Sequence, residues 1–315
     1  MNALMRQLSY ALANLLGVAI LCFIVLFFVQ DQSGDAVSWT QSFNTFFASI
    51  SSGEFGVTLD GQPIWSEVIT RLPATIELWI SAFILAFIFG IPAGVASATH
   101  LNRWQDKWVE SFALIGFSLP VFWWALLLVL WFSLELGLMP VSERISFVYD
   151  IEPISGFILL DSLLAYSKYG FNAFVNALQH LAMPVIVLAI LPTAIVARVT
   201  KTALKNVLSS DYIRMAKGQG ISEKQLVWKY GLANVAAPLL QILTLQLSSL
   251  FTGVFLIEYI FSWPGVTSWL LERIHVGDKQ SVIMGGFLIA SFLVLINAFM
   301  DTLSNLVNPR IRRSR

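Results

Sequence analysis

Charge is what this sequence has least of. Only 12% of its 315 residues are charged, while 57% are hydrophobic. A water-soluble globular chain carries about 25% charged residues. The composition therefore excludes an ordinary soluble domain, because such a chain could not cover its surface with polar groups. The formal net charge is zero, so the charge balance gives no reason to expect a nucleic acid partner.

Cysteine and the common catalytic patterns are scarce as well. Cys22 is the one cysteine in the sequence, which excludes an internal disulfide framework and a multi-cysteine metal site. His100, His180 and His275 lie far apart and form no metal-binding pattern. No GxxxxGK[ST], HExxH, CxxC or GxSxG pattern occurs. We therefore expect a chain that is not an enzyme, with no catalytic residue, metal or cofactor, and without ATP hydrolysis of its own.

The few charges leave six long gaps. Asp, Glu, Lys and Arg are missing between Arg6 and Asp31, Glu77 and Arg103, Glu110 and Glu135, Lys168 and Arg198, Lys229 and Glu258, and Lys279 and Asp301. Each gap can hold the ~20 residues that a membrane-spanning helix needs. The sequence therefore predicts a single all-α membrane domain over residues 1–315, with six spans at 8–29, 75–99, 110–134, 178–198, 236–258 and 281–303. The first run is longer than a signal peptide core, so we expect a retained span.

Basic residues orient these spans. Most of the 19 Lys and Arg residues lie on one side if both termini face the same compartment. Because short cytoplasmic loops carry an excess of Lys and Arg, we expect cytoplasmic termini and a cytoplasmic loop at 199–235. The outside segments are then 30–72 and 135–177. The first is expected to be an interfacial helix plus a loop, or else a gate or external contact. The short apolar run 154–160 suggests a re-entrant or interfacial piece.

Prolines and one carboxylate mark candidate positions of a translocation path. Pro73 is expected to start the second span, which places Glu77 near the positive end of that helix. Glu77 could instead contact a cationic substrate at the outer mouth. The remaining candidates for the pathway or a gate are Pro92, Pro120, Trp123, Pro184 and Pro192. Each of them also has an ordinary packing interpretation.

Local signals give more detail on these helices. The glycines of GIPAG (90–94) are expected to allow a close helix approach. Pro120 lies in mid-span and is expected to kink the third helix. His180 and Pro184 are expected to open the fourth span, and Pro192 to interrupt it. A single histidine at this boundary most often has a structural role.

The stretch from Ser209 to Pro238 is more polar than the runs on either side of it. Ser209 or Ser210 can cap a short helix through its hydroxyl oxygen. Gly220 can end that helix in the left-handed conformation. Ser222 can cap a second helix, with Gln225 completing a capping box. This construction predicts a docking surface for another protein.

The same stretch resembles the cytoplasmic signature of ABC transporter permeases, which reads EAA, three residues, Gly, nine residues and I-x-L-P. With Gly220 aligned, the matching positions are Ala216, Gly220 and Leu232, and the departing ones are Arg214, Met215, Tyr230 and Ala233. DYIRMAKGQGIS looks like the DYVRTARAKGLS-type form of the dipeptide/oligopeptide class, and Pro238 matches a second proline common after the signature. Further motifs fit this class in order and spacing, namely GQPI, RLPATIEL, GIPAG, FSLPVFW, MPVSER, HLAMPV and FSWPG. GQPI, RWQD, IGFSLPVFWWALLL and MPVSER are most similar to the B-type permeases of Sap (sensitivity to antimicrobial peptides) transporters.

The resemblance implies a type I ABC importer-like permease in the bacterial inner membrane. It implies a heterodimer with a second homologous permease, two cytoplasmic ATPase subunits that bind ATP and Mg, often a periplasmic substrate-binding protein, and surrounding membrane lipid. Residues 211–228 would form the coupling helix that contacts the ATPase. The implied coupling residues are Asp211, Tyr212, Arg214, Ala216, Lys217, Gly220, Ser222, Leu232 and Pro238. Lys217 and Lys224 would pair with ATPase carboxylates or remain solvated.

Three functions remain open on the sequence. The first is ATP-driven transport of peptides, including antimicrobial peptides, or of cationic small molecules such as putrescine. The second is general dipeptide, oligopeptide or nickel import. The third, of another class, is an ion-coupled secondary transporter.

Overall fold

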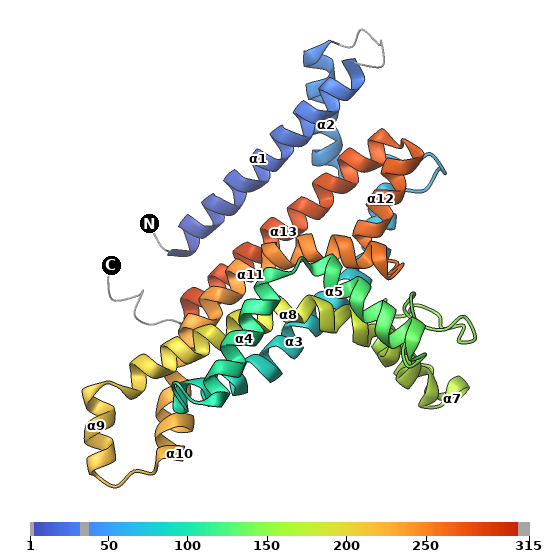
Figure 1. Cartoon of the computed structure of the whole chain (residues 1–315). Helices are drawn as coiled ribbons and strands as arrows, with labels where there is room; N and C mark the ends of the chain where they lie inside the picture. Colours follow the sequence, from blue (N-terminus) through green and yellow to red (C-terminus); the bar gives the residue numbers. More distant parts are fainter. Residues whose placement is uncertain (1–2, 32–37, 308–315) are drawn as a thin grey trace.

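A computed structural model describes residues 3–31 and 38–307 (Figure 1). Within these ranges the chain consists of helices, turns and loops, with one isolated bridge between Val57 and Pro63. The predicted basic tail at 308–315 lies outside the described residues. The all-α fold class is confirmed.

The helices follow one another along the chain without any intervening strand in the described ranges. The first half contains α1 (Ala3–Asp31), α2 (Trp39–Ser52), α3 (Ile64–Thr99), α4 (Trp104–Ser118), α5 (Val121–Leu128) and the π-helical turn η1 (Val129–Glu135). The second half contains α6 (Ile158–Leu164), α7 (Tyr166–Tyr169), α8 (Asn172–Leu208), α9 (Asp211–Gly218), α10 (Glu223–Gln225), the π-helical turn η2 (Leu226–Gly231), α11 (Leu232–Ile260), α12 (Val266–Val276) and α13 (Lys279–Val307).

Several helices are long and apolar enough to cross a membrane. Four qualify by themselves, and they contain the predicted spans 8–29, 75–99, 178–198 and 281–303. A fifth qualifies only if α4 and the α5–η1 segment are taken together. The predicted span 236–258 lies within α11, of which Ser249–Ile260 is recognised as a shorter apolar helix. A polytopic membrane fold is thus confirmed, and the count of six stays a prediction.

The third predicted span is broken rather than only kinked. α4 and the segment after it meet at an angle of 102°. Leu119, between them, has extended backbone with φ −106° and ψ 135°. A residue before proline is pushed out of the helical region by the proline ring, so Pro120 explains why the helix stops here. The predicted distortion at Pro120 is confirmed.

α3 begins earlier than the sequence predicts. Its first residue is Ile64, and Pro73 lies in its interior. The prediction that Pro73 starts this helix is therefore wrong. It follows that Glu77 does not lie at the positive end of its own helix. Proline is tolerated inside membrane helices because neighbouring groups satisfy the backbone oxygen that it leaves free.

α8 departs from the prediction in the same way. It begins at Asn172, so His180 and Pro184 lie inside it and do not open it. The helix also continues through Pro192 to Leu208, and the predicted interruption is wrong. Both prolines are buried. Proline usually kinks or ends a helix. Here the groups packed around both prolines allow α8 to continue through them.

α3 and α8 form the most extensive helix contact in the described part of the chain. Their approach depends on two glycines of α3. A Cβ on Gly94 would lie 2.5 Å from the Ala197 carbonyl oxygen, and one on Gly90 would lie 2.8 Å from the Val196 Cβ. Real Cβ atoms do not come so close to such groups, so only glycine fits. The predicted close approach at GIPAG is confirmed.

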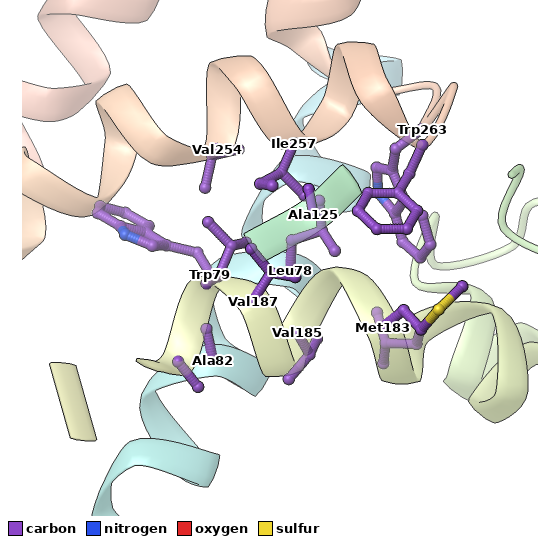
Figure 2. Close-up of a cluster of buried hydrophobic side chains, with 14 of the residues drawn as sticks. Leu78, Trp79, Ala82, Ala125, Met183, Val185, Val187, Val254, Ile257 and Trp263 are labelled. Carbon is purple, nitrogen blue, oxygen red and sulfur yellow. The ribbon is translucent and has the colours of Figure 1, made fainter. Parts of the chain in front are cut away.

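A buried apolar cluster joins this helix pair to α5 and α11. Figure 2 shows Leu78 of α3, Ala125 of α5, Val187 of α8 and Ile257 of α11 converging on one another. Trp263, in the turn after α11, closes the cluster and is fully buried. Its indole N–H donates to the Ala74 carbonyl oxygen at 3.0 Å.

A second buried cluster joins α1, α2 and α13. Phe23 of α1 makes edge-on ring contacts with Trp39 and Phe43 of α2. Phe46, also on α2, reaches Phe287 of α13. The predicted helix in the first outside segment is therefore present. Its aromatic side chains pack on neighbouring helices.

Candidate functional site

The predicted docking stretch forms an arm at one end of the bundle, which we define as residues 209–231. Two residues after α8, the chain turns into α9, and a short turn then leads to α10 and η2 before α11 begins. Figure 1 shows α9 and α10 extending beyond the packed helices. The local signals predict a helix, a glycine turn and a second helix here, and the structure confirms this order with α9, the turn, and α10 continuing into η2. The coupling role that the resemblance implies for 211–228 stays a prediction.

Two of the three local predictions for the arm, at Gly220 and Ser222, are confirmed. Gly220 has φ +83°, the left-handed conformation that glycine adopts without steric cost. The Ser222 hydroxyl oxygen accepts the Gln225 backbone N–H at 3.4 Å, as a cap should. The predicted cap by Ser209 or Ser210 is wrong. Both hydroxyls donate back to carbonyl oxygens of the last turn of α8.

The base of the arm is anchored in the bundle. Ile213 of α9 is buried, and so are Leu226 and Val227 of η2. Val227 belongs to a buried cluster with Leu204 of α8 and Val235 of α11. The arm is therefore packed against the two long helices that it connects, and does not form a loose loop.

The remaining surface of the arm is partly apolar. Tyr212, Met215 and Trp228 are 45%, 65% and 55% exposed. An exposed apolar patch beyond the end of a membrane bundle is a typical protein interaction site. The arm therefore combines a base anchored on α8 and α11 with exposed apolar side chains farther out.

The charges of the arm pair mainly with one another. The Lys217 ammonium donates to the Glu223 carboxylate at 2.8 Å, which joins α9 to α10 across the turn. This hydrogen bond lowers the pKa of the Glu223 carboxyl below its ordinary value. Arg214 pairs with Asp211 at 3.4 Å on α9. Lys224 is exposed and makes no ion pair with any residue in 3–31 or 38–307.

The structure brings most of the implied coupling residues together. Those on α9 or in the following turn are Asp211, Tyr212, Arg214, Ala216, Lys217, Gly220 and Ser222. Leu232 and Pro238 instead belong to α11. Leu232 packs on the buried cluster at the base of the arm. The Asn234 amide donates to the Tyr212 hydroxyl at 3.3 Å and links α11 back to α9.

Glu77, a pathway candidate, is already engaged inside the protein. It is buried and pairs with Arg144 at 2.5 Å. It also accepts the backbone N–H groups of Ile158 at 3.3 Å and Leu159 at 2.9 Å. Glu77 therefore occupies the positive end of α6, whose carbonyl and N–H dipoles favour an anion there. Glu77 therefore lies at the positive end of a helix, as predicted. That helix is α6, and not α3, to which Glu77 belongs.

Glu77 also helps to hold in place the segment 135–177, which is predicted to lie outside. Arg144 donates to the Gly156 carbonyl oxygen at 2.9 Å and lies over the Trp263 ring at 5.4 Å. The His180 Nδ1 atom lies 2.9 Å from the Ser142 carbonyl oxygen, which is a structural contact. The predicted run 154–160 is a short loop followed by the start of α6.

The other pathway candidates do not form one site. Pro92 is exposed on α3, and Trp123 is 48% exposed on α5. Pro184 and Pro192 are buried within α8. Pro120 lies at the break between α4 and α5. Pro120 and Trp123 lie within one turn, since the Trp123 N–H donates to the Pro120 carbonyl oxygen at 3.0 Å. The pathway roles of these five residues stay predictions.

Glu258 and Lys201 are among the buried or partly buried charged groups that sequence reasoning missed. Glu258 of α11 is fully buried and binds the first turn of α12. Lys201 of α8 lies between Asp106 and Glu110 of α4. The partners are far apart along the chain, so no local pattern could reveal the pairing. The one signal in the sequence that could have pointed to Glu258 is its place at the end of the uncharged run 230–257.

No group of three or more His, Cys, Asp or Glu residues that could hold a metal ion occurs in the described ranges. Residues 90–313 match the family described as binding-protein-dependent transport system inner membrane component. The chain belongs to this family. It is therefore an inner membrane component of a transport system, in line with its apolar helices.

Three similar proteins match this chain over most of its length. The Di/tripeptide transport system permease protein DppB of Pseudomonas aeruginosa (strain UCBPP-PA14) is 39% identical over 87% of this chain and 81% of its own length. The Dipeptide transport system permease protein DppB of Escherichia coli (strain K12) is 34% identical, covering 89% and 83%. The Putrescine export system permease protein SapB of Escherichia coli (strain K12) is 33% identical, covering 97% and 95%. The predicted resemblance to both groups of permeases is confirmed.

Proposed function

We propose that this chain is the membrane-spanning permease subunit of an ATP-driven ABC transporter. The arm, residues 209–231, would dock a cytoplasmic ATPase subunit. The observation that supports this most is the arm itself, with a buried base on α8 and α11 and an exposed apolar patch. The absence of a P-loop pattern from the sequence gives such a permease a reason to bind a separate motor.

Further partners belong to the same proposal. A second homologous permease would complete the transporter, together with two ATPase subunits that carry ATP and Mg. A periplasmic substrate-binding protein fits the description of the family as binding-protein-dependent. Movement of the ATPases would reorient the helices as rigid bodies between inward and outward openings.

For the substrate we propose peptides first. Two of the relatives are named as di/tripeptide or dipeptide permeases. Putrescine is the second candidate, because the SapB relative is named as a putrescine export permease and this chain covers 95% of its length. Uptake or release of a radiolabelled dipeptide and of radiolabelled putrescine by vesicles with the assembled transporter would separate the two.

Replacing Gly220 tests the role of the arm. In Gly220→Trp we expect the ATPases to dissociate from the purified complex, because φ +83° strains any residue with a side chain and the indole would stand at the turn. Gly218→Ala is the matched control. Gly218 is helical, and a Cβ there would meet nothing within 4 Å. Co-purification with the ATPases is the measurement.

Two results would contradict the proposal. One is normal ATPase binding and transport by Gly220→Trp. The other is transport that persists when ATP is depleted and collapses with an uncoupler, which would favour an ion-coupled secondary transporter.

A further inference from the structure

A partly buried ion cluster lies outside the arm and has no part in the docking described so far. The Lys201 ammonium lies 2.5 Å from the Asp106 Oδ1 atom and 2.6 Å from the Glu110 Oε1 atom. The Lys201 side chain is 17% exposed and that of Asp106 only 5%, whereas Glu110 is 64% exposed. Lys201 and Asp106 therefore form the shielded pair, and Glu110 adds a second contact at the surface.

Asp106 joins more than the two helices of this ion pair. Its carboxylate also accepts the Ser97 hydroxyl, near the end of α3, and the Asn102 backbone N–H at 2.9 Å. Asn102 lies in the turn between α3 and α4 and has φ +63°. One carboxylate thus holds the end of α3, the turn, the first turn of α4 and the side of α8. We call these contacts of Lys201, Asp106 and Glu110 the latch.

The latch lies between the arm and a break in the bundle. Lys201 is on the last stretch of α8, which continues to Leu208 and enters α9 after two residues. α4 runs from the latch to Pro120, where the chain bends by 102°. α4 is therefore a short rod, tied at one end to the helix that carries the arm and joined at the other end to a bend.

There is also space beside the latch. A cavity of about 290 Å³ is lined by Val109, Glu110, Ala113, Leu114, Arg198 and Lys201. It lies along the contact between α4 and α8. Arg198, the other cation at this cavity, lies over the Phe117 ring at 5.3 Å. A cavity at a helix contact leaves α4 room to shift against α8 without displacing a packed side chain.

We infer that Lys201 is a positioning residue for coupling. Through Asp106 and Glu110 it transmits the displacement of α9 along α8 to α4, and so to the bend at Pro120. The inference rests on the proposed function, because it needs a motor bound to the arm. Coupling between distant sites travels through rigid elements linked by ion pairs and hydrogen bonds. Within the described residues, the ion pairs between α8 and α4 are those of this latch.

The test uses the complete transporter, purified with its ATPases and second permease. Cys22→Ala removes the one cysteine of this chain, and Lys107→Cys adds a probe on α4 at an exposed position before the predicted span 110–134. The readout is the rate of maleimide labelling at position 107, with and without ATP plus vanadate. With the latch intact, we expect trapping of the nucleotide to change this rate.

The decisive variant is Lys201→Met combined with Asp106→Asn. It removes the ion pair and leaves no unpaired charge buried, so the helices should still fold together. We expect ATPase binding and ATP hydrolysis to remain, and the nucleotide-dependent change in labelling to fall about fivefold or more. Lys201→Arg should keep the change. Lys205→Met, an exposed position on the same helix, is the matched control.

The outcomes separate the two proposals. An unchanged nucleotide response in the double variant, or no response in the transporter with an intact latch, would overturn the role of Lys201. A purely structural role predicts lower thermal stability with a normal response. If the unsubstituted chain binds no ATPase, the proposed function itself fails. Co-purification shows this before any labelling is done.

Discussion

At the scale of single residues, buried carboxylates organise the end of the molecule opposite the arm. Glu77 and Glu258 bind the first N–H groups of α6 and α12, which are helices other than their own. Asp278 caps α13 by accepting the Ser281 N–H at 3.1 Å, and it also accepts the Leu59 N–H at 3.0 Å. An anion is favoured at a helix N-terminus by the unpaired N–H groups and the helix dipole. These carboxylates therefore hold short connecting helices on the long ones.

Glu258 provides the sharpest test at this scale. Its carboxylate accepts the Thr75 hydroxyl at 2.5 Å and the N–H groups of Thr267 and Ser268, each at 2.9 Å. Gly265 makes room for it, since a Cβ there would lie 2.0 Å from the Glu258 Oε1 atom. The two N–H groups donate to Oε2, and the Thr75 hydroxyl, whose oxygen accepts the Val266 N–H, donates to Oε1. An amide that keeps its oxygen at Oε2 therefore replaces the acceptor of the Thr75 hydroxyl with an NH₂ group.

We therefore expect Glu258→Gln to destabilise the detergent-solubilised protein by about 1–3 kcal/mol. The amide NH₂ would face the Thr75 hydroxyl, which would lose the hydrogen bond that it donates to Oε1. Thermal unfolding followed by tryptophan fluorescence is the measurement, with Glu152→Gln at an exposed position as control. Equal midpoints for the two variants would show that the hydrogen bonds to Glu258 contribute little.

At the scale of elements, contacts between helices outweigh local rules. α8 contains two prolines and remains one helix, because its buried face packs along α3. α4 and α5 are separated at Leu119 and Pro120, where the backbone becomes extended. The same residue type thus ends one helix and is accommodated in another. The difference depends on the packing around each proline.

The contact between α3 and α8 allows a prediction with a matched control. Gly94→Ala should destabilise the bundle by about 1–3 kcal/mol, because the added methyl group would meet the Ala197 backbone oxygen at 2.5 Å. Gly286→Ala in α13 should be neutral or stabilising, since nothing lies within 4 Å of its Cβ position. Thermal unfolding of both variants is the measurement. Helix propensity alone would stabilise both variants, because alanine is a better helix former than glycine. A Gly94→Ala variant as stable as Gly286→Ala would therefore contradict the role of the close approach.

At the scale of the whole molecule, the start of α1 and the end of α13 lie together. The Thr302 hydroxyl donates to the Gln7 amide oxygen at 3.2 Å. Figure 1 shows these helix ends on the same side of the bundle as the arm, while α2, α7 and α12 lie toward the other side. This arrangement is what an even number of crossings with both ends in one compartment requires.

Labelling in intact cells tests the orientation. With Cys22→Ala as background, Val148→Cys is expected to react with a membrane-impermeant maleimide from outside, since Val148 is 70% exposed. Ser209→Cys, an exposed position where the arm begins, should react only after the cells are permeabilised. Reaction of both residues from outside, or of neither, would contradict the predicted sides.

The sequence by itself determined the class of the molecule and the form of its arm. Six uncharged gaps predicted a polytopic helical membrane protein, and its motifs predicted the transporter family. The left-handed Gly220 and the cap at Ser222 were also predictable. These features depend on hydropathy and on backbone preferences within a few residues, so they can be read locally.

Only the tertiary structure decided where the long helices begin and which charges are paired. Pro73 and Pro184 read as helix starts, yet both lie inside helices whose packing stabilises the earlier turns. Glu258 meets Thr75, and Lys201 meets Asp106, across long stretches of chain. A buried charge is stable only beside its partner, and that partner is chosen by how the helices pack. The latch at Lys201 is visible only once α4 and α8 are side by side.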